Sequence, residues 1–362
     1  MNKGILHIFA STSWGGGEQY VFDLSKKQIE AGYRVILISG RSKTIKDKVK
    51  ALDCRHTILN HRCRFSPFPI YKTHKIILHE KIDVVHVHQF SDAFIAVFAS
   101  LLSARNKRPK VIFTRHLVRK GKRNWMYRWL YGKLHKVIFV SELSKKEFLT
   151  GASISEDKLT VIHNSIAPSA PDTQHINYST YFSVSDKCTL IGFIGQIAKF
   201  KGVELLVEVA ERLRNRKVAF FLAGSGKESY EFFLKNLIAK KKLTQQFFLT
   251  GFINNPGAFI GQMDIGILPS LCTEAFGLSV LEFMQAGIPL IASNTGAQRE
   301  FITHEKTGLL VNPTVDEIIA ALVRLLDDKN YRIQIGKNAQ QAYKIHLNYE
   351  IFYNKIMQIY NL

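Results

Sequence analysis

The chain has 362 residues, 46% of them hydrophobic, which predicts about two globular domains with buried cores. No apolar run reaches the roughly 18 residues of a transmembrane helix, and the N-terminal apolar run is too short for a signal peptide, so we expect a cytoplasmic protein. The formal net charge is +21, and residues 1–168 carry 30 Lys and Arg against 12 Asp and Glu, whereas the remainder carries 20 against 17. Such a one-sided excess predicts an anionic partner for the first half.

The first half alternates β-branched runs with amphipathic segments. Helices are expected at residues 18–32 and in SDAFIAVFASLLSA, after the third strand. This alternation is typical of β-α-β units and a parallel sheet. The expected strands are 4–10, 33–40, 82–89, 110–116 and 136–142.

Within this half, CRHTILNHRC brings four possible zinc ligands together, namely Cys54, His56, His61 and Cys63. Their spacing differs from that of common zinc fingers, and TILN between them looks like a strand. We therefore expect a strand rich in His and Cys, and no metal site. Four cysteines in a chain of this length also exclude a disulfide scaffold.

The densest basic segment, residues 105–136, interleaves Trp and Tyr with Lys and Arg. This composition suits a membrane interface, or less well a nucleic-acid surface. The alternative is an ordinary amphipathic helix whose aromatic side chains lie in the core.

A proline-containing segment at 165–187 indicates a linker, after which the alternation resumes with a helix at 203–216. The expected strands here are 189–195, 218–226, 246–252, 265–270, 289–293 and 308–313. We predict an α/β fold of two Rossmann-like domains whose parallel sheets face a central cleft. The predicted domains are 1–168, 169–345 and a C-terminal helix at 346–362 that could pack back on the first domain.

The first glycine loop, SWGGGEQ, lies between a strand and a helix, where backbone N–H groups can approach an anion. It is neither G-x-G-x-x-G nor a P-loop, which disfavours a dinucleotide dehydrogenase and a P-loop nucleotidase. A simple tight turn is the alternative.

Two stretches of the second half carry charged residues at loop-to-helix junctions. In GFIGQIAKFKG, Lys199 and Lys201 are placed to meet a phosphate. In EAFGLSVLEF, two acids, Glu274 and Glu282, bracket a helix start. The helix dipole favours an acid at Glu274, and Ser279-x-x-Glu282 matches a capping box, so the acids have a purely structural alternative.

The second half contains Gly195 with Lys201-Gly202, AGSG, LTGF and the long block DIGILPSLCTEAFGLSVLEFMQAGIPLIASNTGAQREFI at 264–302. Through these motifs, and most specifically through the last of them, it resembles the C-terminal domain of the family-four retaining glycosyltransferases, which have the GT-B fold. The first half is similar through SWGGGEQYVFDLSKKQIEAGYRV, DVVHVH, FTRH, KVIFVSE and LTVIHNSI. Together these motifs span nearly the whole chain.

The resemblance implies a role for each matching residue. It implies that Glu274 holds hydroxyls of the transferred sugar, Glu282 the ribose, and Lys201 the diphosphate, while His116 faces the sugar. Backbone groups of the two loops would line the pocket, at Gly16, Gly17, Phe276, Gly277 and Leu278.

Three positions depart from the family pattern. The family usually has arginine where this chain has Gln196, so one diphosphate charge is missing, and Lys199 could compensate. Asn164-Ser165 replaces the usual Asn-Gly, and Phe283 replaces the usual alanine after the second glutamate.

We therefore expect a retaining, metal-independent hexosyltransferase with no cofactor, which uses a nucleoside-diphosphate sugar, by preference a UDP-sugar. The basic first half predicts an acceptor such as a lipopolysaccharide core or a lipid-linked saccharide on an anionic membrane, and a peripheral location on its inner face. The alternatives are a nucleic-acid-modifying glycosyltransferase, although a nucleic-acid partner is disfavoured, or a binding module without catalysis.

Overall fold

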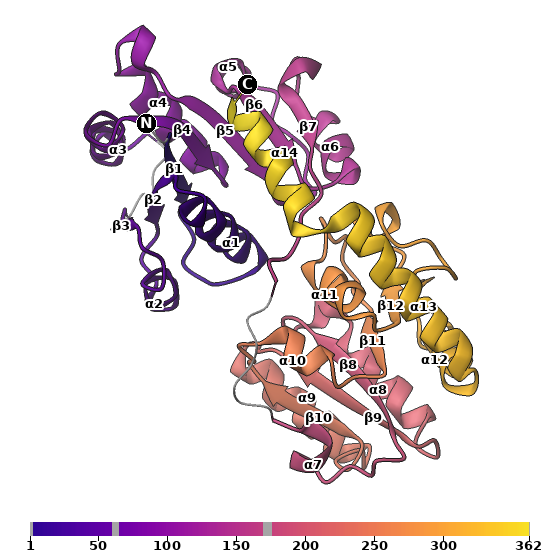
Figure 1. Cartoon of the computed structure of the whole chain (residues 1–362). Helices are drawn as coiled ribbons and strands as arrows, with labels where there is room; N and C mark the ends of the chain where they lie inside the picture. Colours follow the sequence, from indigo (N-terminus) through magenta and orange to yellow (C-terminus); the bar gives the residue numbers. More distant parts are fainter. Residues whose placement is uncertain (1–2, 60–64, 169–175, 362) are drawn as a thin grey trace. The chain divides into compact units, whose positions relative to one another are not determined.

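The computed structural model describes residues 3–59, 65–168 and 176–361, which form two compact units (Figure 1). Unit 1 comprises Met1–Asn164 with Glu350–Leu362, and unit 2 comprises Ser165–Tyr349. The units thus divide four residues before the boundary that the sequence suggests at 168, and the returning segment begins at 350 instead of 346.

Unit 1 is built on a seven-stranded sheet in the order β3-β2-β1-β4-β5-β6-β7, in which every pair of neighbours is parallel. Parallel neighbours need a crossover on a face of the sheet, so the chain returns through a helix or loop after each strand. The strands are β1 Gly4–Phe9, β2 Arg34–Ser39, β3 Arg55–Ile58, β4 Ile82–Val87, β5 Lys110–Arg115, β6 Lys136–Phe139 and β7 Leu159–Val161.

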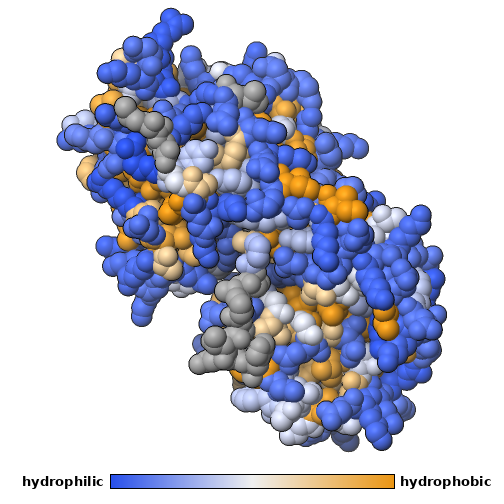
Figure 2. All heavy atoms as spheres, viewed as in Figure 1, coloured by the Kyte–Doolittle hydropathy of each residue, from blue (hydrophilic) through white to orange (hydrophobic). Residues whose placement is uncertain are grey.

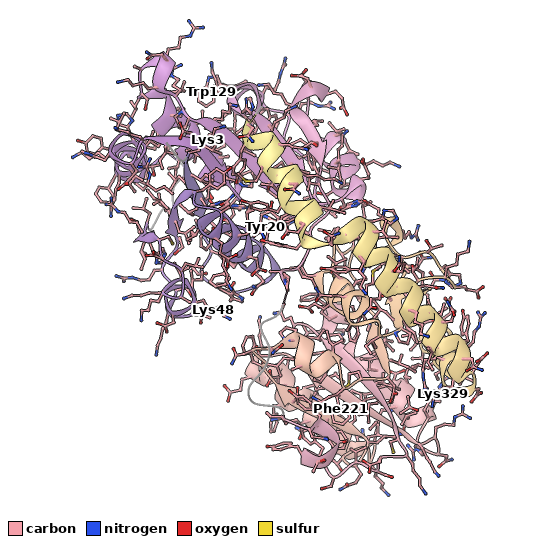
Figure 3. All side chains as sticks on the ribbon, viewed as in Figure 1. Lys3, Tyr20, Lys48, Trp129, Phe221 and Lys329 are labelled. Carbon is pink, nitrogen blue, oxygen red and sulfur yellow. The ribbon has the colours of Figure 1, made fainter. Side chains whose placement is uncertain are left out.

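Seven helices belong to the described part of unit 1: α1 Gly16–Glu30, α2 Lys43–Val49, α3 Pro67–His79, α4 Phe90–Leu101, α5 Trp125–Lys133, α6 Glu142–Leu149 and α14 Tyr349–Asn361. The last of these lies beside α1 on one face of the sheet (Figure 1). The ring of Tyr20 on α1 packs edge-on against Phe352 of α14 at 5.3 Å between centroids, and Figure 3 shows Tyr20 at this junction. The C-terminal helix is therefore part of the packing of unit 1.

Unit 2 has a six-stranded parallel sheet in the order β10-β9-β8-β11-β12-β13. Its strands are β8 Thr189–Ile194, β9 Val218–Ala223, β10 Phe247–Gly251, β11 Ile265–Leu268, β12 Leu290–Ser293 and β13 Leu309–Val311. Its helices are α7 Tyr178–Tyr181, α8 Val203–Arg212, α9 Glu228–Lys240, α10 Pro256–Ile260, α11 Leu278–Ala286, α12 Val315–Asp327 and α13 Lys329–Ala342, which continues into a π-helical turn at Tyr343–Leu347.

The α/β class with two Rossmann-like parallel sheets, predicted from the sequence, is confirmed. The short strand β7 of unit 1 was not among the expected strands, whereas β3 lies within the His- and Cys-rich segment that was expected to form one. The predicted linker at 165–187 contains α7, whose buried Tyr178 packs against Phe259 at 5.1 Å between ring centroids. None of the described helices is long and apolar enough to cross a membrane.

The aromatic side chains of α5 mostly face the core, as the structural alternative for this segment requires. Tyr127 and Tyr131 are 2% and 1% exposed, and Trp129 stacks on Phe98 of α4. Trp125 is the exception, with 81% of its surface exposed. Polar and charged residues cover most of the face shown in Figure 2.

The departure at Phe283 is matched by a glycine on the neighbouring strand. Phe283 of α11 is fully buried, and a Cβ atom at Gly266 of β11 would lie 2.5 Å from Cδ1 of its ring. No side chain fits at position 266 while the phenylalanine stays in place. The two residues therefore form one packing unit between α11 and the sheet.

We predict strong coupling between these two positions. Gly266→Ala should overpack the site and cost about 1–3 kcal/mol, and Phe283→Leu should relieve that clash, so the double variant should lose less stability than the two single variants together. Hydrogen exchange of the β11 and α11 amides measures the local stability. Phe220→Leu on β9, two strands away in the sheet, is the matched control and should be additive with Gly266→Ala; additivity of the Gly266 and Phe283 changes would contradict the prediction.

Candidate active site

The predicted site residues fall into two sets, one in each unit, and both sets follow the carboxyl ends of strands. In unit 2, Gly195 follows β8, and the loop that contains Glu274 follows β11. In unit 1, the glycine loop at 15–17 follows β1, and His116 follows β5. Because all strands of each sheet are parallel, the residues of each set gather at one edge of their own sheet, the edge at which open α/β sheets bind ligands.

Lys201 and Glu274 form the polar centre of the unit 2 set. Lys201 Nζ lies 2.5 Å from Glu274 Oε1, and both side chains are mostly buried, with 23% and 16% exposed. The Ser270 hydroxyl donates to the same oxygen at 2.7 Å. Within the described residues, both donors therefore reach Oε1, and the second carboxylate oxygen remains available to accept from a hydroxyl.

Backbone contacts fix the two loops that carry this pair. The Leu271 N–H donates to the Phe200 carbonyl at 2.8 Å, which ties the loop after β11 to the turn at Lys199–Lys201. Gly202 ends this turn with a φ of 72°, and a Cβ there would lie 2.1 Å from the Pro269 carbonyl oxygen. Only glycine allows the two loops to approach this closely.

The helix that follows Glu274 begins in an unexpected way. Its N-cap is Gly277, with a φ of 89° and no side-chain cap, and Ser279 is already the second residue of α11. The capping box of Ser279 and Glu282, which was the structural alternative for these acids, is therefore not formed, because a capping box needs the serine at the N-cap itself. Glu282 lies on the second turn of α11 and is partly buried.

The remaining predicted residues of unit 2 differ in exposure. Phe276 is buried and packs on Phe301 at 4.7 Å between ring centroids, which anchors the loop in front of Gly277. Leu278, the first residue of α11, is half-buried. Gln196 is exposed after β8, and its side chain carries no charge.

In unit 1, the glycine loop and His116 come together. Gly15 is the N-cap of α1, and Gly16 and Gly17 are its first residues. A Cβ at Gly17 would lie 4.0 Å from Cγ of His116. The structure thus places the predicted sugar-facing histidine beside the glycine-rich start of α1.

Behind His116 lies a cluster of three further histidines, which sequence reasoning did not select. His7 on β1 and His86 on β4 are fully buried, and His88, just after β4, is 8% exposed. Their signal in the sequence was the alternation in VVHVHQ, which puts His86 and His88 on one face of a strand. Burial, the largest cause, lowers the pKa of His7 and of His116 to about 4, and the pKa values of His86 and His88 well below the ordinary range.

The zinc interpretation of CRHTILNHRC lies partly outside the described residues, because His61 and Cys63 are not among them. His56 on β3 has its Nε2 2.9 Å from the Ser39 hydroxyl, and burial raises the pKa of the Cys54 thiol to about 11. The expectation of no metal at this segment stays a prediction.

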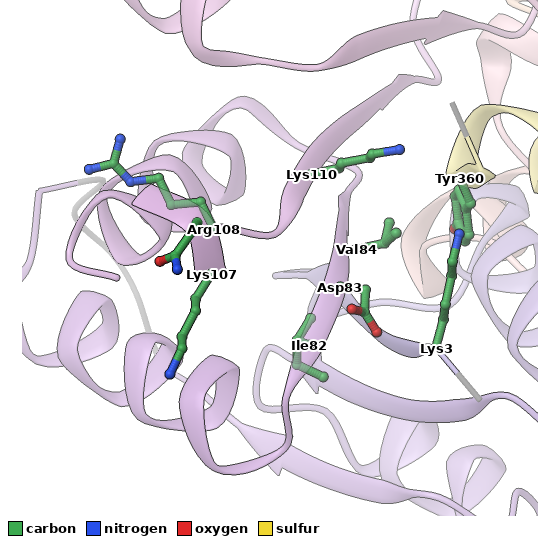
Figure 4. A pocket seen from close by; sticks show the side chains of 9 residues that line it. Lys3, Ile82, Asp83, Val84, Lys107, Arg108, Lys110 and Tyr360 are labelled. Carbon is green, nitrogen blue, oxygen red and sulfur yellow. The ribbon is translucent and has the colours of Figure 1, made fainter. Parts of the chain in front are cut away.

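A hollow of about 280 Å³ lies at the opposite, amino edge of the unit 1 sheet (Figure 4). Lys3, Asp83 and Lys110 line it at the starts of β1, β4 and β5. Asp83 is already engaged, because its carboxylate accepts the Gly4 N–H at 2.8 Å. This hollow is distinct from the edge that carries the predicted site residues.

Comparison with protein families places the chain. Residues 14–170 match the model for glycosyltransferase family 4, and residues 182–342 match the model for glycosyl transferases group 1. Together the two matches cover most of both units. The chain belongs to the family-four glycosyltransferases of GT-B fold.

Individual relatives agree with this assignment. The chain is 28% identical over 282 residues to an uncharacterized glycosyltransferase of Methanocaldococcus jannaschii, covering 72% of this chain and 70% of the relative. It is 30% identical over 173 residues to the O-antigen biosynthesis glycosyltransferase WclY of Escherichia coli, covering 47% and 46%. It is 25% identical over 341 residues to the phosphatidylinositol N-acetylglucosaminyltransferase GPI3 subunit of Saccharomyces cerevisiae, covering 88% and 74%.

Solved structures agree on the fold. A glycosyltransferase from Rickettsia africae superposes with a TM-score of 0.87 at 22% identity, over 99% of this chain and 98% of that one. Anabaena HepE, solved in complex with UDP and glucose, superposes with a TM-score of 0.82 at 17% identity, over 99% of both chains. The roles of the individual site residues stay predictions.

The histidine cluster predicts how the stability of unit 1 depends on pH. In the unfolded chain the histidine side chains have pKa values of about 6.5. Between that pH and about 4, the folded unit therefore binds fewer protons than the unfolded chain does. The contribution of the histidines to the free energy of unfolding is therefore fully present above pH 6.5 and is lost as the pH falls toward about 4. A pKa shift of the size seen at His7 corresponds to a loss on the order of 3 kcal/mol.

Tryptophan fluorescence can follow this change selectively, because Trp14, Trp125 and Trp129 all lie in unit 1. Urea titrations at several pH values should give a midpoint that falls steadily below about pH 6.5. Burial raises the pKa of Asp23 to about 6 and acts in the opposite direction, so Asp23→Asn is the proper background. A midpoint that stays constant between neutral pH and pH 5 would contradict the prediction.

Proposed function

We propose that this glycosyltransferase moves a hexose from a nucleoside-diphosphate sugar, with UDP-sugars favoured, to a hydroxyl of a membrane-associated glycan such as a lipopolysaccharide core or lipid-linked saccharide. The transfer proceeds with retention and without a metal ion. The observation that carries the proposal is the cluster of Lys201, Ser270 and Glu274 beside the N-terminus of α11.

The cluster supports separate roles for its cationic and acidic groups in binding the donor. The Lys201 ammonium and the α11 N-terminus would stabilise a diphosphate leaving group by charge, the role that a metal ion plays in other transferases. Glu274 would be repelled by phosphate but accepts from sugar hydroxyls through its second oxygen. The 2.5 Å between Lys201 and Glu274 suits a donor in which the sugar is joined directly to the phosphate.

The relatives support the substrate class. Anabaena HepE has been solved with UDP and with UDP-glucose. WclY acts in O-antigen biosynthesis, and WaaG, whose structure superposes with a TM-score of 0.70, is involved in lipopolysaccharide biosynthesis. Retention is the outcome that the family resemblance implies, and the engagement of Glu274 by Lys201 and Ser270 argues against its use as a nucleophile.

Glu282 provides the sharpest test of the donor assignment. Glu282→Ala removes an acceptor for the ribose hydroxyls, so it should weaken UDP-glucose binding by about tenfold or more. Titration calorimetry with UDP-glucose, in buffer with and without EDTA, measures this loss and should give the same affinity in both buffers.

The matched control is Glu208→Ala, which removes an exposed carboxylate from α8 in the same unit and should not change the affinity. An unchanged affinity in the Glu282 variant would refute the ribose role. A thermal-shift panel of other nucleotide sugars identifies the donor if UDP-glucose is the wrong one, because a ligand that binds only the folded state raises its stability.

The membrane part of the proposal is that the protein is cytoplasmic and held peripherally at the inner face of an anionic membrane. It rests on exposed aromatic side chains that lie beside cations in unit 1. On α3, Phe68 and Tyr71 are 69% and 55% exposed, and Lys75 Nζ lies 4.9 Å above the Tyr71 ring. Trp125 at the start of α5 is also exposed, and α4 packs against both α3 and α5. Exposed aromatic rings and lysines of this kind suit an anionic lipid interface.

Flotation with vesicles tests this surface. Wild-type protein should float with vesicles that contain phosphatidylglycerol at low salt and much less with neutral phosphatidylcholine vesicles or at high salt. Phe68→Ser with Trp125→Ser should reduce flotation severalfold, whereas Phe232→Ser, which removes an equally exposed aromatic from α9 of unit 2, should not. Retention of the double variant at the wild-type level would show that α3 and α5 are not the lipid-binding surface.

A further inference from the structure

A continuous chain of hydrogen bonds runs through unit 1 from α1 to His116. The Gln28 side chain lies 2.8 Å from His7 Nε2, with its oxygen toward the ring. His7 Nδ1 lies 3.4 Å from His88 Nε2, and His88 Nδ1 lies 3.1 Å from His116 Nε2. Gln28 and His7 are fully buried, and His88 is 8% exposed.

The position of every proton in this chain follows from its first member. The Gln28 amide nitrogen faces the Met357 sulfur at 3.9 Å, and because a thioether only accepts, the amide oxygen must face His7. That oxygen also only accepts, so His7 carries its proton on Nε2 and its Nδ1 is a lone pair. His88 must then donate from Nε2, and by the same step His116 donates from Nε2.

We propose that Gln28, acting through His7 and His88, fixes the tautomer of His116 so that its Nδ1 is presented as a hydrogen-bond acceptor to a substrate hydroxyl beside Gly17. This rests on the proposed function and on the role that the family resemblance implies for His116, that of facing the transferred sugar. Gln28, His7 and His88 are positioning residues, and they act only through the ring of His116.

The buried setting keeps the chain in this form. Burial lowers the pKa values of all three histidines, so each ring is neutral near pH 7 and must hold one donor and one acceptor. The Tyr20 ring packs edge-on against His116 at 4.9 Å and against His88 at 5.7 Å between centroids, which restricts both rings. Moreover, Gln28 and the glycine loop belong to one helix, α1, so the start of the helix and the tautomer of His116 are set by the same element.

A metal centre is the competing interpretation, because nitrogen atoms of His7, His86 and His88 lie within 4.8 Å of one another. However, both ring nitrogens of His86 are already bonded, Nδ1 to the Tyr360 hydroxyl at 2.7 Å and Nε2 to the Thr114 hydroxyl at 2.6 Å. A metal ion would have to break one of these bonds in the core. The geometry favours the hydrogen-bonded chain.

The tautomers can be measured directly. Long-range ¹H–¹⁵N spectra of protein labelled at histidine distinguish protonated from unprotonated ring nitrogens, and wild-type protein should show His7, His88 and His116 protonated at Nε2 alone. This measurement needs neither a donor nor a variant, so it is independent of the proposed function. A His116 ring protonated at Nδ1, or a stoichiometric bound Zn²⁺ that shifts the His7 and His88 signals when Zn²⁺ is added, would overturn the proposal.

Variants of Gln28 then test the direction of control. Gln28→Met removes the acceptor at similar shape and should produce a mixture of His116 tautomers, whereas Gln28→Glu keeps an acceptor and should restore the single form. Thr114→Val is the matched control, because it removes a buried hydroxyl from His86 but leaves the chain to His116 intact. A His116 spectrum that responds to Thr114→Val and not to Gln28→Met would reverse the assignment.

Kinetics with UDP-glucose as the donor connect the tautomer to function. Gln28→Met should lower kcat/KM roughly tenfold, the cost of losing one hydrogen bond to the substrate, and Gln28→Glu should recover most of it. A general loss of stability would instead lower the activity of Thr114→Val as much. If wild-type protein does not use UDP-glucose, the donor assignment fails while the spectra still decide the tautomer.

Discussion

Parallel strand pairing is the constraint on which the rest of this structure depends. A parallel neighbour can be reached only by a crossover, so helices and loops cover both faces of each sheet and the strands themselves become buried. Because the strands are parallel, the carboxyl ends of all strands in a sheet lie at the same edge. Residues far apart in the sequence, such as Lys201 and Glu274, are thereby brought into contact without any local preference that would pair them.

A second consequence concerns polar side chains inside such a sheet. Strands buried on both faces are normally apolar, yet unit 1 places His7 and His86 in its central strands, β1 and β4. Their burial is tolerated because nearly every ring nitrogen has a partner, including Gln28 from α1 and Tyr360 from α14. The helices that cover this face therefore supply hydrogen bonds as well as apolar surface.

The alternation of strands and helices, and hence the fold class, could be predicted from the sequence because hydrophobic periodicity reports burial directly. Short elements escaped this reasoning: β7 has three residues, too few for a periodic signal, and α7 is a single turn. The family motifs also indicated which residues would cluster at the strand ends. Their contacts, such as that between Ser270 and Glu274, depend on tertiary structure and could not be predicted.

One structural alternative failed and one segment was interpreted only in part, for identifiable physical reasons. Ser279 and Glu282 match the local pattern of a capping box, but the N-cap of α11 is Gly277 in a left-handed conformation. The side-chain pattern around it does not predict this conformation. The aromatic residues of α5 were interpreted from the composition of their segment, and composition does not determine which side of a helix faces the core. Conversely, the exposed Phe68 and Tyr71 on α3 went unnoticed, since their segment is neither strongly basic nor rich in glycine.

The path of the chain through unit 1 also bears on how the protein is made. Residues up to Asn164 emerge first from the ribosome, but α14, which completes the same unit, is synthesised only after all of unit 2. Until then the hydroxyl of Tyr360 is missing from His86, and the apolar surface that meets Phe352 is uncovered. Unit 2 is continuous in the sequence and can fold as soon as it leaves the ribosome. The N-terminal unit, although translated first, is the last to acquire all of its native contacts.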